Sequence, residues 1–261
     1  MSTHPIAVFD SGLGGLTVLR ALRDRLPHED FFYFADTRFL PYGDRPETFL
    51  RERGVLIARA LVERGAKALV IACNTATAAA AEAIRAAIEL PVVALEPGVK
   101  PAVGLTKTGV IGVLATTRTL ASERFQRLVG NHANGHRVIA RPCPGLAEAI
   151  EAEGPDSAVV ASLLDTFVTP LATAAADVVV LGCTHYPWVA EAIARRMPAG
   201  TVLLDTGEPV ARQLERLLTA GGLLGGGHGH LTVATSGAPT AVSATVDRLF
   251  GQKLKIEHWE P

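Results

Sequence analysis

Two of the chain's three cysteines occupy matching places in the sequence. Cys73 ends the apolar run of LVIACNTAT (69–77), and Cys183 ends that of VVVLGCTHYP (178–187). Hydroxyl or amide side chains and a predicted helix follow each cysteine, and a helix N-terminus favours a thiolate. A thiol and a thiolate facing each other across a cleft could remove a proton from one face of a carbon and return one to the other. That chemistry inverts a stereocentre.

The neighbouring residues allow several kinds of chemistry. Asp10 opens DSGLGG (10–15), which lacks the spacing of a dinucleotide fingerprint and the lysine of a phosphate loop. His185 could orient or protonate a ligand, or simply cap a helix. A zinc site built from the two cysteines and His185 is conceivable, but no C-x-x-C spacing supports it, so we expect no metal. His228 and His230, in a glycine-rich loop, are interpreted as a solvated loop tip.

The composition excludes several classes of protein. The 261 residues carry a net charge of −1, so no global field attracts nucleic acid or an anionic membrane surface. Three cysteines argue against a disulfide framework, and Cys143, between two prolines, is assigned to packing. Neither a signal peptide nor an apolar run of about 18 residues is evident. These features predict a cytoplasmic protein with reduced thiols.

Short apolar runs alternate with helical patterns along the whole chain, which is typical of an α/β fold with doubly wound, mostly parallel sheets. Strands are predicted at 6–9, 31–35, 69–72, 92–95, 110–115, 137–140, 177–182, 201–205, 231–236 and 254–257. The main helices are predicted at 16–26, 46–65, 75–89, 119–130, 144–154, 156–175, 186–197 and 206–222, with a last helix through Phe250. Prolines and glycines at 96–104 suggest a crossing between two lobes. The echo between the cysteine segments suggests that the lobes are pseudo-symmetric.

Four motifs in this order resemble those of the glutamate racemases, in the aspartate/glutamate racemase superfamily: DSGLGG (10–15), PYG (41–43), ACNTAT (72–77) and GCTHYP (182–187). The resemblance implies cofactor-independent interconversion of L- and D-glutamate, which supplies peptidoglycan synthesis. It also implies an active site in the cleft between two lobes and a homodimer. The implied domains are 1–96 with 207–261, and 97–206. A TSG segment (235–237) belongs to the resemblance, but Ala238 stands where the family usually has Asp; we expect this segment to be remote from the chemistry.

The resemblance also assigns roles to residues. It implies that Cys73 and Cys183 are the two acid/base groups, that Asp10 assists Cys73, and that Glu151 and His185 assist Cys183. The residues it implies as substrate contacts are Asp10, Ser11, Pro41, Tyr42, Gly43, Asn74, Thr75, Thr116, Thr119 and Thr184. Because few basic residues fall in the motifs, carboxylate binding would rest on backbone N–H and hydroxyl groups.

Three alternatives stay open. An aspartate or hydantoin racemase, or a maleate-type isomerase, is a relative within the same superfamily, although PYG and the two cysteine motifs favour glutamate. A regulatory role through protein binding, such as inhibition of DNA gyrase, leaves no mark that the sequence shows. A cysteine hydrolase is disfavoured, because Cys183 and His185 are only two residues apart and no second histidine stands in a strand-end motif.

Overall fold

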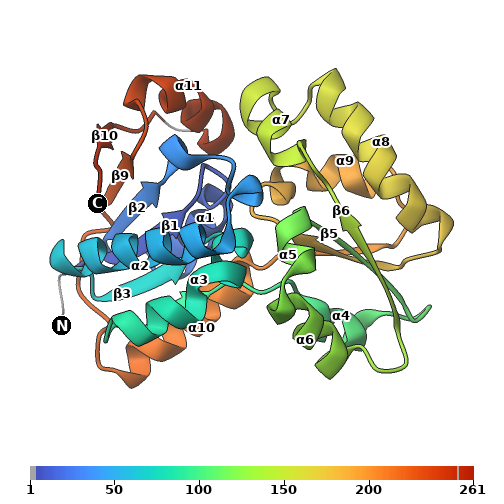
Figure 1. Cartoon of the computed structure of the whole chain (residues 1–261), viewed down its shortest axis with the longest axis horizontal. Coiled ribbons are helices and arrows are strands. Elements are labelled where there is room, and N and C mark those ends of the chain that lie inside the picture. Colours follow the sequence, from blue (N-terminus) through green and yellow to red (C-terminus); the bar gives the residue numbers. More distant parts are fainter. Residues whose placement is uncertain (1–3, 252) are drawn as a thin grey trace. The chain divides into compact units, whose positions relative to one another are not determined.

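The computed structural model describes residues 4–251 and 253–261, and the chain divides into two compact units (Figure 1). Unit 1 comprises Met1–Leu95 and Gly207–Pro261, and unit 2 comprises Glu96–Thr206. Each unit has its own parallel sheet, so the predicted α/β class with two lobes is confirmed. In the described part of the chain, no helix has the length and apolar character needed to cross a membrane.

Unit 1 contains a six-stranded sheet in which every described pairing is parallel. Its strand order is β10 (Ile256–His258), β9 (Leu231–Thr235), β2 (Phe31–Ala35), β1 (Ile6–Asp10), β3 (Ala68–Ile71) and β4 (Val92–Ala94). The connecting elements are α1 (Leu16–Arg25), η1 (Thr37–Phe39), η2 (Tyr42–Asp44), α2 (Glu47–Glu63), α3 (Asn74–Ala87), α10 (Gly207–Ala220) and α11 (Pro239–Phe250). Alternate residues of β1 pack with α2 and α3, and the residues between them are equally buried. Both faces of the sheet are therefore covered, as a parallel sheet requires.

Unit 2 repeats the arrangement on a smaller scale. Its parallel strand order is β6 (Arg137–Pro142), β5 (Val110–Ala115), β7 (Val178–Gly182) and β8 (Val202–Leu204). Its helices are α4 (Val99–Leu105), α5 (Thr117–Ala121), α6 (Glu123–His132), α7 (Leu146–Glu153), α8 (Ala158–Thr173), η3 (Tyr186–Val189) and α9 (Ala190–Ala194). Residues of α4 and α6 pack with β5 and β7 in one core, while α7 and α9 contact α8.

The single helix predicted at 119–130 is wrong, because the chain turns at Ser122. This residue is extended, with φ −70° and ψ 143°, and it separates α5 from α6. Its hydroxyl donates to the carbonyl of Thr119 at 2.7 Å and accepts from the N–H of Phe125 at 3.2 Å. A serine that satisfies a free N–H in this way starts a new helix.

One further prediction needs correction. Segment 186–197 is a 3-10 turn followed by the short helix α9, and not one long helix. The crossing predicted at 96–104 agrees with the change of unit between Leu95 and Glu96, and α4 begins within the same segment. Pro101 lies in the first turn of α4, where the missing N–H of proline costs no intrahelical hydrogen bond. The prolines and glycines that suggested a crossing thus also suit the start of a helix.

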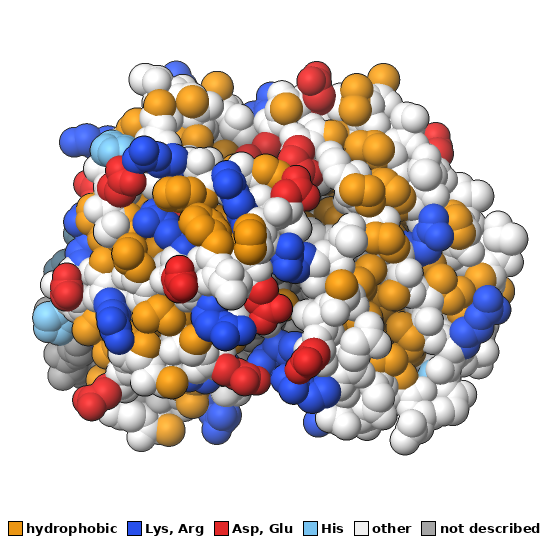
Figure 2. All heavy atoms as spheres, viewed as in Figure 1, with side chains coloured by type: hydrophobic (Ala, Val, Ile, Leu, Met, Phe, Trp, Pro, Cys, Tyr) orange, Lys and Arg blue, Asp and Glu red, His pale blue; other side chains and the backbone are white. Residues whose placement is uncertain are grey.

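Acidic and basic side chains are interspersed on the face shown in Figure 2, and neither sign forms a continuous field there. This pattern agrees with the net charge of −1. In both units the polar residues that follow the strands gather at the carboxyl edge of the sheet, where parallel sheets bind ligands.

Candidate active site

Cys73 lies at the carboxyl edge of the unit 1 sheet, two residues after β3 and directly before α3. Its backbone is extended, and it caps α3: the thiol sulfur accepts the N–H of Ala76 at 3.3 Å. The hydroxyl of Ser11 lies 3.3 Å from the same sulfur. Only 5% of Cys73 is exposed. A buried thiol at a helix N-terminus beside a hydroxyl is placed to hold or exchange a proton.

Asp10 ends β1, next to Cys73, and is fully buried. Its Oδ1 accepts the backbone N–H of Ser11 at 2.7 Å and lies 3.3 Å from the Ser11 hydroxyl. Its Oδ2 accepts the N–H of Gly15, and the hydroxyl of Tyr33 lies 3.4 Å from it. Ser11 therefore contacts both the carboxylate and the Cys73 thiol. This contact gives Asp10 a route to the sulfur through one hydroxyl.

Gly15 permits the approach of the backbone to Asp10. A Cβ atom at this position would lie 2.9 Å from the Cβ of Asp10 and 3.0 Å from that of Ala72. Real Cβ atoms essentially never approach so closely, so any larger residue would push the loop away from the carboxylate. Gly15 thus lets the loop backbone reach the Asp10 carboxylate. This role agrees with the interpretation of segment 10–15 as a loop that does not bind a dinucleotide.

Asn74 is the clearest sign of a ligand in unit 1. It follows Cys73 directly and is only 4% exposed, yet neither its amide nitrogen nor its amide oxygen has a hydrogen-bond partner among the described residues. The hydroxyl of Thr77, one turn further along α3, is likewise unpartnered within that part of the chain. Thr75 between them is buried as well. Leaving a buried polar group unsatisfied costs about 1–3 kcal/mol, which a bound ligand would offset.

Cys183 occupies the corresponding edge of unit 2, directly after β7. Its sulfur lies 3.6 Å from Nδ1 of His185, whose Nε2 lies 2.6 Å from Oε1 of Glu151 on α7. Burial alone would lower the pKa of His185, but its contacts with Cys183 and Glu151 raise that pKa well above the usual value. Cys183, His185 and Glu151 thus form a continuous chain from thiol to carboxylate.

The predicted threonine contacts of unit 2 lie beside this chain. Thr116 follows β5, the strand that pairs with β7, and its hydroxyl lies 2.9 Å from that of Thr119. Thr116 also caps α5 by accepting the N–H of Thr119 at 3.2 Å. Thr184, next to Cys183, is 6% exposed. These three hydroxyls surround the carboxyl ends of β5 and β7, where they can bind a polar ligand.

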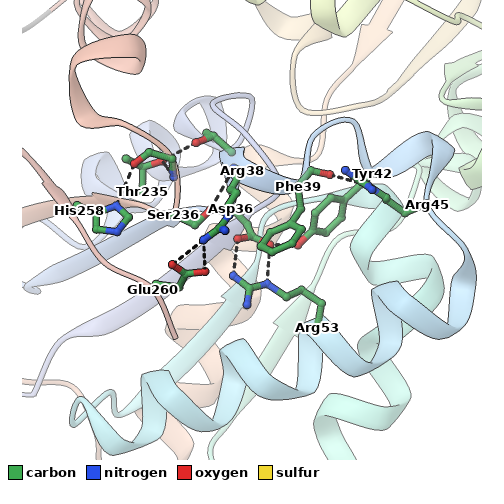
Figure 3. A network of polar contacts seen from close by, with 12 residues as sticks. Asp36, Arg38, Phe39, Tyr42, Arg45, Arg53, Thr235, Ser236, His258 and Glu260 are labelled. Carbon is green, nitrogen blue, oxygen red and sulfur yellow. Dashed lines mark hydrogen bonds and ion pairs between the residues drawn. The ribbon is translucent and has the colours of Figure 1, made fainter.

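The PYG segment (41–43) follows β2 and η1, with a cis peptide bond before Pro41, and Tyr42 is labelled in Figure 3. Tyr42 is buried, and its hydroxyl donates to Oδ2 of Asp36 at 2.6 Å. The hydroxyl is thus already engaged within unit 1, so Tyr42 can meet a substrate through its backbone. Gly43 has open space around the position of a Cβ atom and no positive φ, so no steric or backbone reason for glycine exists there.

Several functional neighbours were not found from the sequence. Asp36 and Arg53 form a buried ion pair behind Tyr42, and Tyr33 reaches Asp10. For Asp36, the only signal in the sequence was its place directly after the strand predicted at 31–35.

The TSG segment, expected to be remote from the chemistry, contacts the loop that leads to Pro41. Thr235 lies 2.6 Å from Thr37, hydroxyl to hydroxyl, and the Ser236 hydroxyl accepts the N–H of Arg38 at 3.2 Å.

Of the other residues singled out by type, Cys143 follows β6 and interacts with Tyr186 and with Cys183, whereas His228 and His230 precede β9. Cys143 is buried, and burial raises the pKa of its thiol to about 12. The rings of His228 and His230 lie 5.7 Å apart, and both backbone N–H groups donate to Asp30. Within residues 4–251 and 253–261, no group of three or more His, Cys, Asp and Glu side chains is arranged to hold a metal ion.

Comparisons with known proteins give one consistent answer. The model of the Asp/Glu/Hydantoin racemase family matches residues 17–214. A glutamate racemase from Stutzerimonas stutzeri is 45% identical over 254 residues, which cover 97% of this chain and 96% of that protein. The crystal structure of a glutamate racemase isoform from Bacillus anthracis gives a TM-score of 0.90 at 30% identity, covering 98% of this chain and 97% of that one. The Francisella tularensis glutamate racemase in complex with D-glutamate gives 0.87 at 26% identity, covering 100% and 98%.

Proposed function

Since the chain belongs to the Asp/Glu/Hydantoin racemase family, we propose that it interconverts L- and D-glutamate, with Cys73 and Cys183 as its two acid/base groups. The identity to glutamate racemases along almost the whole chain carries the choice of glutamate. The observation that carries the mechanism is that each unit places a buried thiol, with its own hydrogen-bonding partner, at the carboxyl edge of a parallel sheet.

The reaction needs no oxidant or reductant. One thiolate takes the Cα proton of glutamate and becomes a thiol, while the electron pair of the C–H bond is delocalised into the α-carboxylate. The other thiol then protonates Cα on the opposite face and becomes a thiolate. The two sulfurs end with exchanged protonation states, so the product form of the enzyme is ready for the other enantiomer.

The Cys183 side supplies a charged partner. The raised pKa of His185 favours the imidazolium, whose positive charge stabilises the neighbouring thiolate. Glu151 accepts from the far nitrogen of the ring and fixes its orientation, at 2.6 Å. His185 can also pass a proton to the sulfur between turnovers, over the 3.6 Å that separate Nδ1 from Sγ.

The Cys73 side relies on neutral donors. The N–H of Ala76 lies 3.3 Å from the sulfur and stabilises its anion, and the Ser11 hydroxyl, at the same distance, donates its one proton either to Asp10 or to the sulfur. Asp10 holds Ser11 through two contacts of its Oδ1. The carboxylate is thus placed to assist Cys73 through the serine hydroxyl.

Binding of glutamate would use the polar groups around each thiol. The unpartnered Asn74 amide is the strongest candidate, because a carboxylate or ammonium group would satisfy it. The other proposed contacts are Asp10, Ser11, Thr75, Thr116, Thr119, Thr184 and the backbone of Pro41, Tyr42 and Gly43. Donors that are already ordered lower the cost of forming the carbanion, whose Cα–H precursor is a very weak acid.

We further propose that the enzyme acts as a cytoplasmic homodimer that supplies D-glutamate for peptidoglycan. The family resemblance supports this setting. Sedimentation velocity at micromolar concentration tests the dimer, and loss of growth without external D-glutamate after gene deletion tests the supply. Normal growth of the deletion strain would contradict that role.

The test of the activity is circular dichroism of L- and D-glutamate, in both directions, with L-aspartate and a hydantoin as competing substrates. The expected result is racemisation of glutamate, with deuterium entering Cα in D2O. Because enantiomers have equal free energies, kcat/KM must be equal in the two directions, which checks the assay. Preference for aspartate or the hydantoin over glutamate would overturn the assignment.

A further inference from the structure

A buried ion pair supports the segment that contains Tyr42 (Figure 3). Asp36 follows β2, is fully buried, and donates its backbone N–H to the carbonyl of Asp10 at 2.9 Å. Both oxygens of its carboxylate are engaged. Oδ1 accepts from Nη2 of Arg53 at 2.7 Å, and Oδ2 accepts from Nε of Arg53 at 2.9 Å and from the Tyr42 hydroxyl at 2.6 Å.

Arg53 makes this contact rigid. Its side chain, on α2, is only 9% exposed and meets Asp36 with two parallel hydrogen bonds. The guanidinium also lies over the ring of Phe39 in η1, 4.4 Å from the ring centroid. Burial alone would lower the pKa of Arg53, but the contacts with Asp36 raise it. A planar guanidinium that is held on two sides has little freedom, and lysine has neither the two-pronged geometry nor the planar face that these contacts use.

The ion pair fixes the side chain of Tyr42. The tyrosine ring packs edge-on against Phe9, with the centroids 6.4 Å apart, and its hydroxyl ends on Asp36. Burial, followed by the charge of Asp36, raises the pKa of Tyr42, so the hydroxyl stays a neutral donor. Since the side chain points into unit 1, its anchoring determines where the backbone of 41–43 lies.

Other contacts hold the flanks of the same loop. The Nε of Arg45 donates to the carbonyl of Phe39 at 3.1 Å, and Thr235 and Ser236 bind the loop at Thr37 and Arg38. If these contacts served only the stability of unit 1, they would not all need to meet at one short loop beside Asp10. The convergence indicates that the position of this loop matters.

We propose that Asp36 and Arg53 are positioning residues for glutamate binding: they anchor Tyr42 and so hold the backbone of 41–43 where the substrate is bound. This inference rests on the proposed function. Neither residue needs to touch glutamate.

The chain offers two matched controls. Glu29 and Lys67 form a second buried ion pair in unit 1, with each side chain 3% exposed, but they precede β2 and β3 and so lie at the opposite edge of the sheet. Arg38 is on the same loop as Tyr42 but pairs with Glu260 at the surface, where its side chain is 57% exposed. Breaking the Glu29–Lys67 pair shows the effect of losing a buried ion pair on stability alone. Replacing Arg38 shows the effect of removing a charge from the loop without breaking the buried pair.

The experiment measures KM and kcat for both enantiomers in Arg53→Lys, Asp36→Asn and Tyr42→Phe. We expect KM to rise about tenfold in the first two, the equivalent of one displaced contact of about 1.4 kcal/mol, while kcat stays within about twofold. Tyr42→Phe keeps the ion pair but removes its link to the loop, so KM should rise about threefold, by the scale of one hydrogen bond. Amide hydrogen exchange in 37–45 should increase in all three.

The controls should behave differently. Lys67→Gln should lower Tm without changing KM, and Arg38→Gln should change neither by much. Unchanged KM in Tyr42→Phe and in every ion-pair variant that folds would overturn the inference and leave the racemase assignment intact. Absence of glutamate racemisation by the unmodified protein would overturn the proposed function, and the inference with it.

Discussion

The surroundings of Cys73 and Cys183 differ, although both thiols end a central strand of a parallel sheet. Cys73 caps a long α-helix and contacts a serine hydroxyl that leads to Asp10. Cys183 precedes only a 3-10 turn and contacts an imidazole that leads to Glu151. In the proposed mechanism, the Cys73 anion is stabilised by neutral donors and a helix terminus, and the Cys183 anion by a cation. The fold thus fixes where each thiol lies, while the local partners decide how it is charged.

This difference agrees with the chemistry that racemisation demands. A two-thiol mechanism needs one thiolate and one thiol at the same time, and each must be able to exchange roles. Two coupled thiols in identical surroundings could share one proton with neither sulfur preferred. Unequal partners bias which of the two sulfurs holds that proton.

The largest effect is expected from removing either thiol. Cys73→Ser and Cys183→Ser should each lower racemisation by at least about a hundredfold, because a serine hydroxyl is a far weaker acid than a thiol. In D2O each variant should still exchange the Cα proton of one enantiomer only, and not the same one. NMR of both enantiomers measures this exchange. Full racemisation by either variant would eliminate the two-thiol mechanism.

The second largest effect concerns His185, which gives the Cys183 side its charge. His185→Asn should lower kcat by roughly tenfold to a hundredfold, which is below the full acid–base contribution of about 10²–10⁴ because His185 acts through the Cys183 thiol. Because the pKa of His185 is raised, the imidazolium and its support of the thiolate are lost as pH rises through that pKa. The variant should therefore lack this alkaline limb of the pH–rate profile.

The same ionisation affects stability. A raised pKa in the folded state contributes stability that is fully present below the unfolded pKa of about 6.5 and is lost as pH rises through the folded value. Denaturant unfolding at several pH values should show this loss in the unmodified protein and not in His185→Asn. His136, on a turn of the same unit where its ring meets the carbonyl of Asn134, is the matched control. Equal pH dependence in both proteins would contradict the assigned role.

A smaller effect is expected at Ser11, which connects Asp10 to Cys73. Ser11→Ala removes one hydroxyl at 3.3 Å from the sulfur and should lower kcat about tenfold, as for one lost hydrogen bond to a charged group. Tyr33→Phe is the control, because its hydroxyl donates to the carbonyl of Gly12 at 2.8 Å and lies 3.4 Å from Asp10. If both variants lost the same activity, Ser11 would merely hold Asp10 in place.

Much of this arrangement could be predicted from the sequence, because the signals were local. The apolar runs that end in cysteine predicted two strands, and they placed Cys73 and Cys183 at the carboxyl edges of the sheets. The break at Ser122 was missed, since a serine inside a helical pattern caps a new helix only when the backbone is extended there. Contacts between distant positions were hidden as well. Glu151 was assigned to His185 only through the family resemblance, and Asp36 to Arg53 not at all.

Cys143 tests whether a place at the sheet edge is enough, and here the smallest effect is expected. It follows β6, and its N–H donates to the carbonyl of Ala115, so it lies at the same edge as Cys183. Its thiol donates to the carbonyl of Arg141 at 3.4 Å, and it also interacts with the Tyr186 hydroxyl and with the charge of Cys183. Because burial raises its pKa to about 12, this thiol stays neutral near pH 7.

Cys143→Ala should therefore keep racemisation within about twofold and cost roughly 1 kcal/mol of stability, the usual scale of a small buried substitution. Thiol titration of the native enzyme should lose only its slowest phase in this variant. A hundredfold loss of activity would show that the edge itself, and not the serine and histidine partners, makes a cysteine functional. Retained activity would show that partners separate Cys73 and Cys183 from the third thiol.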